Sequence, residues 1–237
     1  MKNTIIRSAA AAITVTAAFV STSLHVGAAS ASPSPTPASF STLQQALEGR
    51  ITARENLLST LHLRVNGSPT LTGNDKSALT AIISHAQGGM TTLMSQAQQA
   101  TTAAELKPIA NAMIVDYRVY VVVAPQVDLT IIADRESSVS GRLANLEPAI
   151  QNLITLEQQR GKNVSSAEAT FADYKTNVSN AQEQIGQVST ATLLGETPQN
   201  YPGSTAVFQG ARTSMESART DFGNAWSDLK TLIADLK

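Results

Sequence analysis

Seven polar side chains lie within or beside the most apolar stretch of the sequence, and they are the best candidates for chemistry. They are Asp116, Tyr117, Arg118, Tyr120, Asp128, Asp134 and Arg135. Charged side chains are seldom buried unless they are paired. We therefore expect these residues either to form a buried polar network or to line a site for a small ligand. Asp116 and Tyr120, four residues apart, are expected on one helix face, whereas Arg118 needs a partner from another helix.

Catalytic motifs are missing from the sequence. His62 and His85 are the two histidines beyond the first thirty residues, which is little material for a catalytic triad. The zinc-protease, nucleophile-elbow, P-loop and dinucleotide-binding patterns are absent. The sequence has no cysteine, which excludes disulfides, thiol nucleophiles and cysteine-bound metals. We predict that the protein is not an enzyme and uses no cofactor or metal, with a hydrolase as the residual alternative.

The charge of the chain is small and balanced. Its 237 residues include 17 basic and 18 acidic side chains, a formal net charge of −1. A protein that binds nucleic acid is expected to carry a clustered basic surface, so we predict no nucleic-acid partner.

The first 31 residues have the pattern of a secretory signal peptide. Lys2 and Arg7 precede an apolar run over 8–20, and Ala29, Ser30 and Ala31 form a small-residue cleavage site. Polar residues interrupt the run, which makes a membrane anchor the weaker interpretation. We predict cleavage after about Ala31. The mature chain, without a transmembrane segment, would be extracellular, either secreted or associated with the cell envelope. Residues 32–38, rich in Ser, Pro and Thr, are expected to form an extended spacer.

The last part of the sequence predicts one long helix. Pro202 and Gly203 should stop any earlier helix, and Ser204 is the expected N-cap. From there apolar residues recur in an unbroken a/d heptad, which is typical of a coiled-coil-like seam packed within a bundle or against a partner. The nine positions of this heptad seam are Phe208, Ala211, Met215, Ala218, Phe222, Ala225, Leu229, Leu232 and Leu236.

Helical periodicity also covers 43–65, 79–97, 129–153 and 171–188. Cap signatures start helices at Thr72, Thr102 and Ser165. Residues 106–132 are apolar on all sides, which predicts a central helix kinked near Pro125. Tyr201, between turn-forming residues, either packs across the bundle end or is exposed in a surface turn.

These elements predict an all-α fold, an elongated antiparallel helical bundle of five to six long helices, coiled-coil-like in its packing. The bundle would span 39–237, either as one unit or as two helical-hairpin subdomains over 39–125 and 126–237.

Several short motifs, together with the signal peptide, resemble an uncharacterised family of secreted, all-helical proteins of Gram-positive actinobacteria. The resemblance covers most of the mature chain and rests on Leu71-Thr72 with Asp75-Lys76, Tyr117-Arg118-Val119-Tyr120 with Pro125, Ala133-Asp134, and Thr197-Pro198 with Tyr201-Pro202. It implies export and a helical fold and adds no activity.

Two functions fit these predictions. The first is a non-enzymatic, secreted or envelope-associated protein with a structural or protein-interaction role, binding a protein partner or a second copy of itself through helices. The alternative is a carrier or sensor of a small or lipidic ligand bound between helices near residues 117–134.

Overall fold

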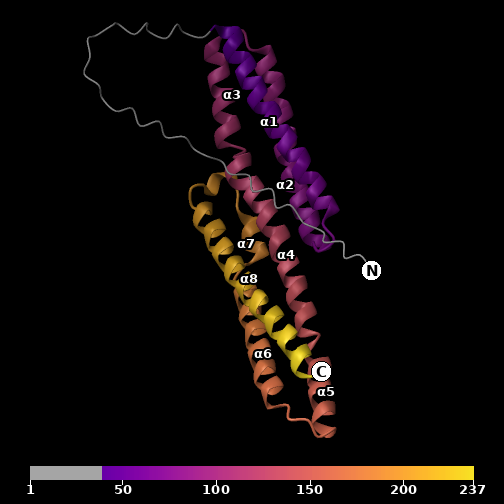
Figure 1. Ribbon diagram of the computed structural model, residues 1–237. Coiled ribbons are helices and arrows are strands. Elements are labelled where there is room, and N and C mark those ends of the chain that lie inside the picture. Colours follow the sequence, from indigo (N-terminus) through magenta and orange to yellow (C-terminus); the bar gives the residue numbers. More distant parts are fainter. Residues whose placement is uncertain (1–38) are drawn as a thin grey trace, which may run out of the picture. The chain divides into compact units, whose positions relative to one another are not determined.

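The computed structural model describes residues 39–237, and every regular element in this range is helical. Five of the α-helices exceed twenty residues, which confirms the all-α prediction. The predicted signal peptide (1–31) and spacer (32–38) lie outside the described residues. In chain order the elements are α1 (Phe40–Gly67), α2 (Gly73–Gln99), α3 (Ala103–Val115), the π-helix η1 (Val119–Val123), α4 (Ala124–Ala144), α5 (Glu147–Gln159), α6 (Ser165–Gly186), α7 (Thr190–Gly195), the 3-10 helix η2 (Pro198–Asn200) and α8 (Ser204–Asp235) (Figure 1).

Helices α1, α2 and α3 pack around one apolar core. The Thr72 hydroxyl accepts a hydrogen bond from the Asp75 amide at 3.1 Å and so caps α2. Thr102 and Glu105 form a complete capping box at the start of α3. Both caps confirm the sequence prediction, because they depend on residues only three apart. The buried side chains of this core include Ile51, Leu58, Leu79, Ile83, Met90 and Met113.

Helices α4, α6 and α8 pack together further along the chain, and α5 follows α4 (Figure 1). α8 lies along α6, and their shared core continues onto the end of α4 and onto α5. A smaller cluster, with Leu129, Ala133 and Phe208, joins the start of α8 to α4. α4 also contacts α1, so it connects the two groups of helices, which fall in one compact unit. Within 39–237, none of the helices combines the length and hydropathy of a membrane span.

The helix predicted over 129–153 is divided in the structure. α4 ends at Ala144, a turn follows, and α5 begins at Glu147 with Pro148 in its first turn. Proline has no amide hydrogen, and its ring clashes with the carbonyl four residues earlier, here that of Ala144. The carbonyl of Leu143 accepts hydrogen bonds from the Leu146 amide at 3.0 Å and from the buried Tyr174 hydroxyl of α6 at 2.7 Å.

Two predicted N-caps are displaced by one residue toward the N-terminus. Val164 holds the N-cap position of α6, and the Oδ1 of Asn163 accepts hydrogen bonds from both the amide and the hydroxyl of Ser165, which is already helical. Gly203 holds the N-cap position of α8, and Ser204 is its buried first residue. Asparagine accepts hydrogen bonds from the backbone two residues on, which explains the shift at α6.

The helix predicted over 106–132 is interrupted before Pro125. α3 ends at Val115, and the chain turns at residues 116–118 before η1 begins. Arg118 is left-handed, with φ 40° and ψ 43°. Pro125 lies in the first turn of α4, directly after the wider π-turns, where its missing amide is tolerated. The predicted kink near Pro125 is therefore wrong in position.

Candidate functional site

The turn at residues 116–118 sends neighbouring side chains to opposite sides of the chain. A non-glycine residue in the left-handed region costs roughly 1–2 kcal/mol, so the packing around Arg118 must hold it there. Asp116 is the C-cap residue of α3, whereas Tyr120 belongs to η1. The two residues line different pockets, and the expectation that they share a helix face is wrong.

Two arginines near this turn each lie over a tyrosine ring. The guanidinium carbon of Arg118 is 4.4 Å from the ring centroid of Tyr201, which belongs to the loop before α8. The guanidinium carbon of Arg54, on α1, is 4.7 Å from the ring centroid of Tyr120. Arg118 thus receives its partner from a distant segment, as predicted, but that partner is aromatic. Cation–π contacts of this kind contribute about 0.5–2 kcal/mol each.

Neither arginine forms an ion pair with a carboxylate among residues 39–237. The Nε atoms of Arg54 and Arg118 are both buried and have no hydrogen-bond partner. Burial, as the largest effect, lowers the pKa of the Arg54 guanidinium. A buried donor that makes no hydrogen bond costs about 1–3 kcal/mol, and more where the group is charged. Arg54 Nη1 already donates to the carbonyl of Arg50 at 3.0 Å, so the unused hydrogen-bonding capacity of the two arginines lies at their Nε atoms.

Both arginines and both tyrosines line one pocket of about 210 Å³, which we call the arginine–tyrosine pocket. Its lining contains no acidic residue. The remaining lining residues are apolar: Met113, Ile114, Val119 and Val121. Guanidinium groups bind carboxylate and phosphate oxygens with charge-assisted hydrogen bonds. The pocket is thus suited chemically to an oxyanion.

Tyr117 faces a second pocket on the other side of the turn. Its ring lies against Gly89 of α2, where a Cβ atom would overlap the ring, and 6.1 Å from the His85 ring, centroid to centroid. This pocket, of about 360 Å³, is mostly apolar but also includes Asp116 and Gln126. The absence of a side chain at Gly89 therefore provides the space that Tyr117 occupies.

The loop that carries Tyr201 is held at its start by two hydrogen bonds from the side chain of Gln126. The side-chain amide of this buried α4 residue donates to the carbonyl of Leu193 at 2.7 Å and to that of Glu196 at 2.8 Å. A buried, doubly bonded amide is costly to replace. Gln126 thus holds the start of the loop in place, and the loop sets Tyr201 over Arg118.

Three of the seven predicted residues lie outside both pockets. Asp128 pairs with Arg64 of α1, Nη1 to Oδ1 2.5 Å, in a half-exposed contact of small expected energy. Asp134 accepts the Thr72 amide at 3.0 Å, and Arg135 is exposed. Burial, as the largest effect, raises the pKa of the Asp134 carboxyl, and the nearby Asp75 adds to this, while the Thr72 amide acts in the opposite direction. The two aspartates tie α4 to α1 and to the start of α2 and do not form one network with Arg118.

The heptad seam of α8 packs against α6 and α4 rather than facing outward. Eight of its nine predicted positions are buried, and Leu229 is partly buried against the same core. Trp226, next to Ala225, is 54% exposed and borders an apolar groove of about 690 Å³ between α8 and the end of α4. The seam is used within the chain and is not available to a partner.

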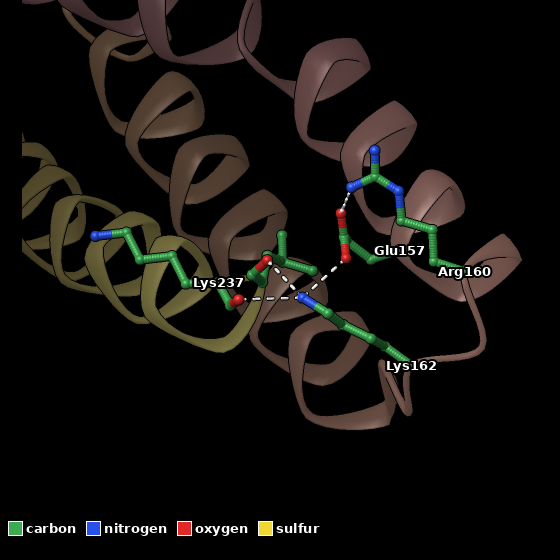
Figure 2. Close-up of polar contacts among 5 residues, drawn as sticks. Glu157, Arg160, Lys162 and Lys237 are labelled. Atoms are coloured by element: carbon green, nitrogen blue, oxygen red, sulfur yellow. Dashed lines mark hydrogen bonds and ion pairs between the residues drawn. The ribbon is translucent and has the colours of Figure 1, made fainter.

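The buried carboxylate of Glu157 lies near the end of α5 and is linked through Lys162 to the end of the chain after α8. Glu157 pairs with Arg160 at 2.6 Å and with Lys162 at 2.9 Å. Figure 2 shows Lys162 between Glu157 and the end of α8, where its ammonium also donates to the carbonyls of Leu236 and Lys237 at 3.4 and 3.2 Å. The hydrogen bond from Lys162, first among several causes, lowers the pKa of the Glu157 carboxyl. This cluster joins α5, the loop that leads to α6 and the end of the chain after α8, which gives it a structural explanation.

Arg54 is the site residue that the sequence prediction missed. It lies on the amphipathic helix α1, where an arginine is ordinarily a solvated surface residue, so nothing in its neighbours distinguishes it. The position of Tyr201 between turn-forming residues was only a weak indication that it packs against other elements. In the structure its ring packs on Arg118.

No protein-family model matches the chain, and neither does any curated protein or solved structure. The resemblance to a secreted actinobacterial family therefore stays a prediction from the motifs.

Proposed function

We propose that this chain is an exported, non-enzymatic helical protein that binds a small oxyanion, a phosphate ester or a carboxylate, in the arginine–tyrosine pocket. The observation that carries the proposal is the pair of arginines, Arg54 and Arg118, whose buried Nε atoms have no acceptor in a pocket without acidic residues. The carrier or sensor function considered for the sequence thereby acquires a defined site. Export rests on the signal-peptide pattern of residues 1–31.

The local backbone supports the same conclusion. The left-handed Arg118 and the π-helix η1 are both unfavourable features, and both adjoin the pocket. Such features persist where the surrounding structure maintains them, and they occur often at functional sites. Here they set Arg118 toward Tyr201 and Tyr120 toward Arg54.

The heptad seam packs against other helices of the same chain. This favours a binding site at another place on the molecule. An interaction through the seam would require α8 to leave its bundle. The arginine–tyrosine pocket needs no such rearrangement, because its tyrosines and apolar rim are already partly exposed.

The test is a calorimetric titration of the purified protein with ethyl phosphate and with propionate. We expect saturable binding of at least one probe at one site per chain. Arg54→Gln and Arg118→Gln should each weaken it roughly ten- to a hundredfold, since each removes a charge-assisted contact. Arg135→Gln, on the exposed face of α4, is the matched control and should leave the affinity unchanged.

Absence of saturable binding by both probes would overturn the proposal. Equal affinities in the wild-type protein, Arg54→Gln and Arg118→Gln would also overturn it, because binding would then occur at another place.

A further inference from the structure

The apolar rim of the arginine–tyrosine pocket indicates which oxyanions it takes. Ile114, Tyr120 and Val121 all line the pocket and are 50%, 48% and 43% exposed. Val115, the neighbour of Ile114, is also exposed. Single exposed apolar residues are common, but these lie together and directly beside two cations.

We infer that the ligand is a monomeric anionic amphiphile, with its phosphate or carboxylate head at Arg54 and Arg118 and its alkyl chain across Ile114, Tyr120 and Val121. This inference rests on the proposed function. The four apolar lining residues of the pocket offer no hydrogen bonds from their side chains to an inorganic anion. The oxygens of such an anion that do not contact the arginines would lose their water contacts against Met113, Ile114, Val119 and Val121.

The volume of the pocket agrees with a ligand whose head group lies inside the pocket and whose alkyl chain extends out of it. At about 30 Å³ per water molecule, 210 Å³ corresponds to about seven waters. That space takes a head group and the first few carbons of a chain. Any longer chain must leave the pocket, and on leaving it meets the exposed side chains of Ile114 and Val121.

The tyrosines complete the match to an amphiphile. One face of each ring is covered by a guanidinium, while 48% of Tyr120 and 37% of Tyr201 remain exposed. An aromatic ring offers apolar contact area to methylene groups, and an arginine stacked on it stays oriented toward the pocket. The head and the chain of one ligand are therefore recognised by adjacent groups.

The experiment is a calorimetric series with ethyl, butyl, hexyl and octyl phosphate, each below its micelle concentration, and with the alcohols of the same lengths. We expect the affinity for the phosphates to rise roughly fourfold per buried methylene over the first several carbons and then to level off. The alcohols should bind much more weakly, because they lack the group that pairs with Arg54 and Arg118.

Substitutions at the apolar rim of the pocket test where the alkyl chain of the ligand lies. Ile114→Gln combined with Val121→Thr should flatten the dependence of the affinity on alkyl-chain length, so that the loss of affinity is larger for octyl phosphate than for ethyl phosphate. Both positions are partly exposed, so folding should be preserved. Leu63→Gln is the matched control, because Leu63 on α1 is 73% exposed and does not line the pocket.

The possible results separate the two proposals. Binding of ethyl phosphate without any gain from longer chains would overturn the amphiphile and leave the oxyanion site intact, whereas no binding by any probe would overturn both. A chain-length effect that the rim variants do not change would show that the alkyl chain lies elsewhere. Alcohols that bind as well as phosphates would show that Arg54 and Arg118 do not hold the head group. Either result would overturn the inference. Adsorption to phosphatidylglycerol vesicles without saturable binding of octyl phosphate would overturn it in favour of a membrane surface.

Discussion

The heptad seam of α8 and the run at residues 119–123 are both rich in apolar residues, yet they form different kinds of structure. The seam alternates large residues such as Phe222 with alanines at 211, 218 and 225, and its helix runs for 32 residues without a break. Residues 119–123 are four valines and a tyrosine without a helical period, and they form a π-helix after a left-handed residue.

The two regions differ in how they place polar side chains relative to their apolar neighbours. A regular heptad places its a and d side chains on one face, so the seam of α8 packs against apolar residues of α6 and α4. At the turn, the change of direction brings Arg54 and Arg118 beside aromatic rings and leaves their Nε atoms without acceptors. Regular packing yields stability, and the candidate site occurs where regularity is interrupted.

The largest expected effect tests the packing beside the turn. Gly89→Ala should destabilise the protein by about 3 kcal/mol, because its Cβ atom would overlap the ring of Tyr117. Gly88→Ala, one residue earlier and free of any contact, should stabilise it by about 1 kcal/mol through helix propensity. Thermal and urea unfolding of both variants provides the measurement, and effects of the same sign would contradict the close approach of Tyr117.

The second test applies to the seam. Ala218→Leu should cost about 2 kcal/mol, because Ala218 is fully buried between α8 and α6 and leaves no room for three more carbons. Ser217→Leu, at the adjacent exposed position, is the control and should change the free energy of unfolding by less than about 0.5 kcal/mol. An unchanged melting temperature for Ala218→Leu would show that α8 packs differently.

The third test addresses the left-handed residue. Both Arg118→Gly and Arg118→Ala lose the contact with Tyr201, but only glycine adopts this backbone without strain. Arg118→Gly should therefore be more stable than Arg118→Ala by about 1 kcal/mol.

At Arg135, inside α4, the order should reverse, with alanine more stable than glycine by about 1 kcal/mol. Chemical denaturation of the four variants checks both comparisons. The same order at both positions would contradict the left-handed turn.

The smallest expected effects concern pH, and two carboxylates should respond with opposite signs. The folded pKa of Glu157 is lowered, chiefly by Lys162, so its stabilising contribution is present above the unfolded pKa and is lost as the pH falls through the folded value. The folded pKa of Asp134 is raised, chiefly by burial, so its contribution is favourable below the unfolded pKa and is lost as the pH rises through the folded value.

Melting temperatures between about pH 3 and pH 7 measure both contributions. The advantage of the wild-type protein over Glu157→Gln should shrink toward acid, whereas its stability relative to Asp134→Asn should fall toward neutral pH. Glu168→Gln, at an exposed position of α6, serves as the control. Parallel pH curves for all of these proteins would contradict the environments of the two carboxylates.

The sequence by itself determined the helices whose signals are local. Thr72 and Thr102 cap helices through residues three positions away, and the heptad of α8 depends only on its own repeat. The effects of the two prolines were not predicted correctly. Pro148 divides the predicted helix over 129–153, but Pro125 is accommodated by the π-turns before it.

Only the tertiary structure decided the candidate site. Tyr120 meets Arg54 of α1 and Arg118 meets Tyr201 of the loop before α8, and no periodicity within one segment specifies such pairs. Likewise, Asp134 was grouped with Arg118 as a candidate for one polar network, but in the folded chain it accepts a hydrogen bond from the Thr72 amide. Hydrogen bonds over three or four residues and repeats along one helix are properties of the local chain, whereas contacts between distant segments exist only once α1, η1 and the loop held by Gln126 have packed together.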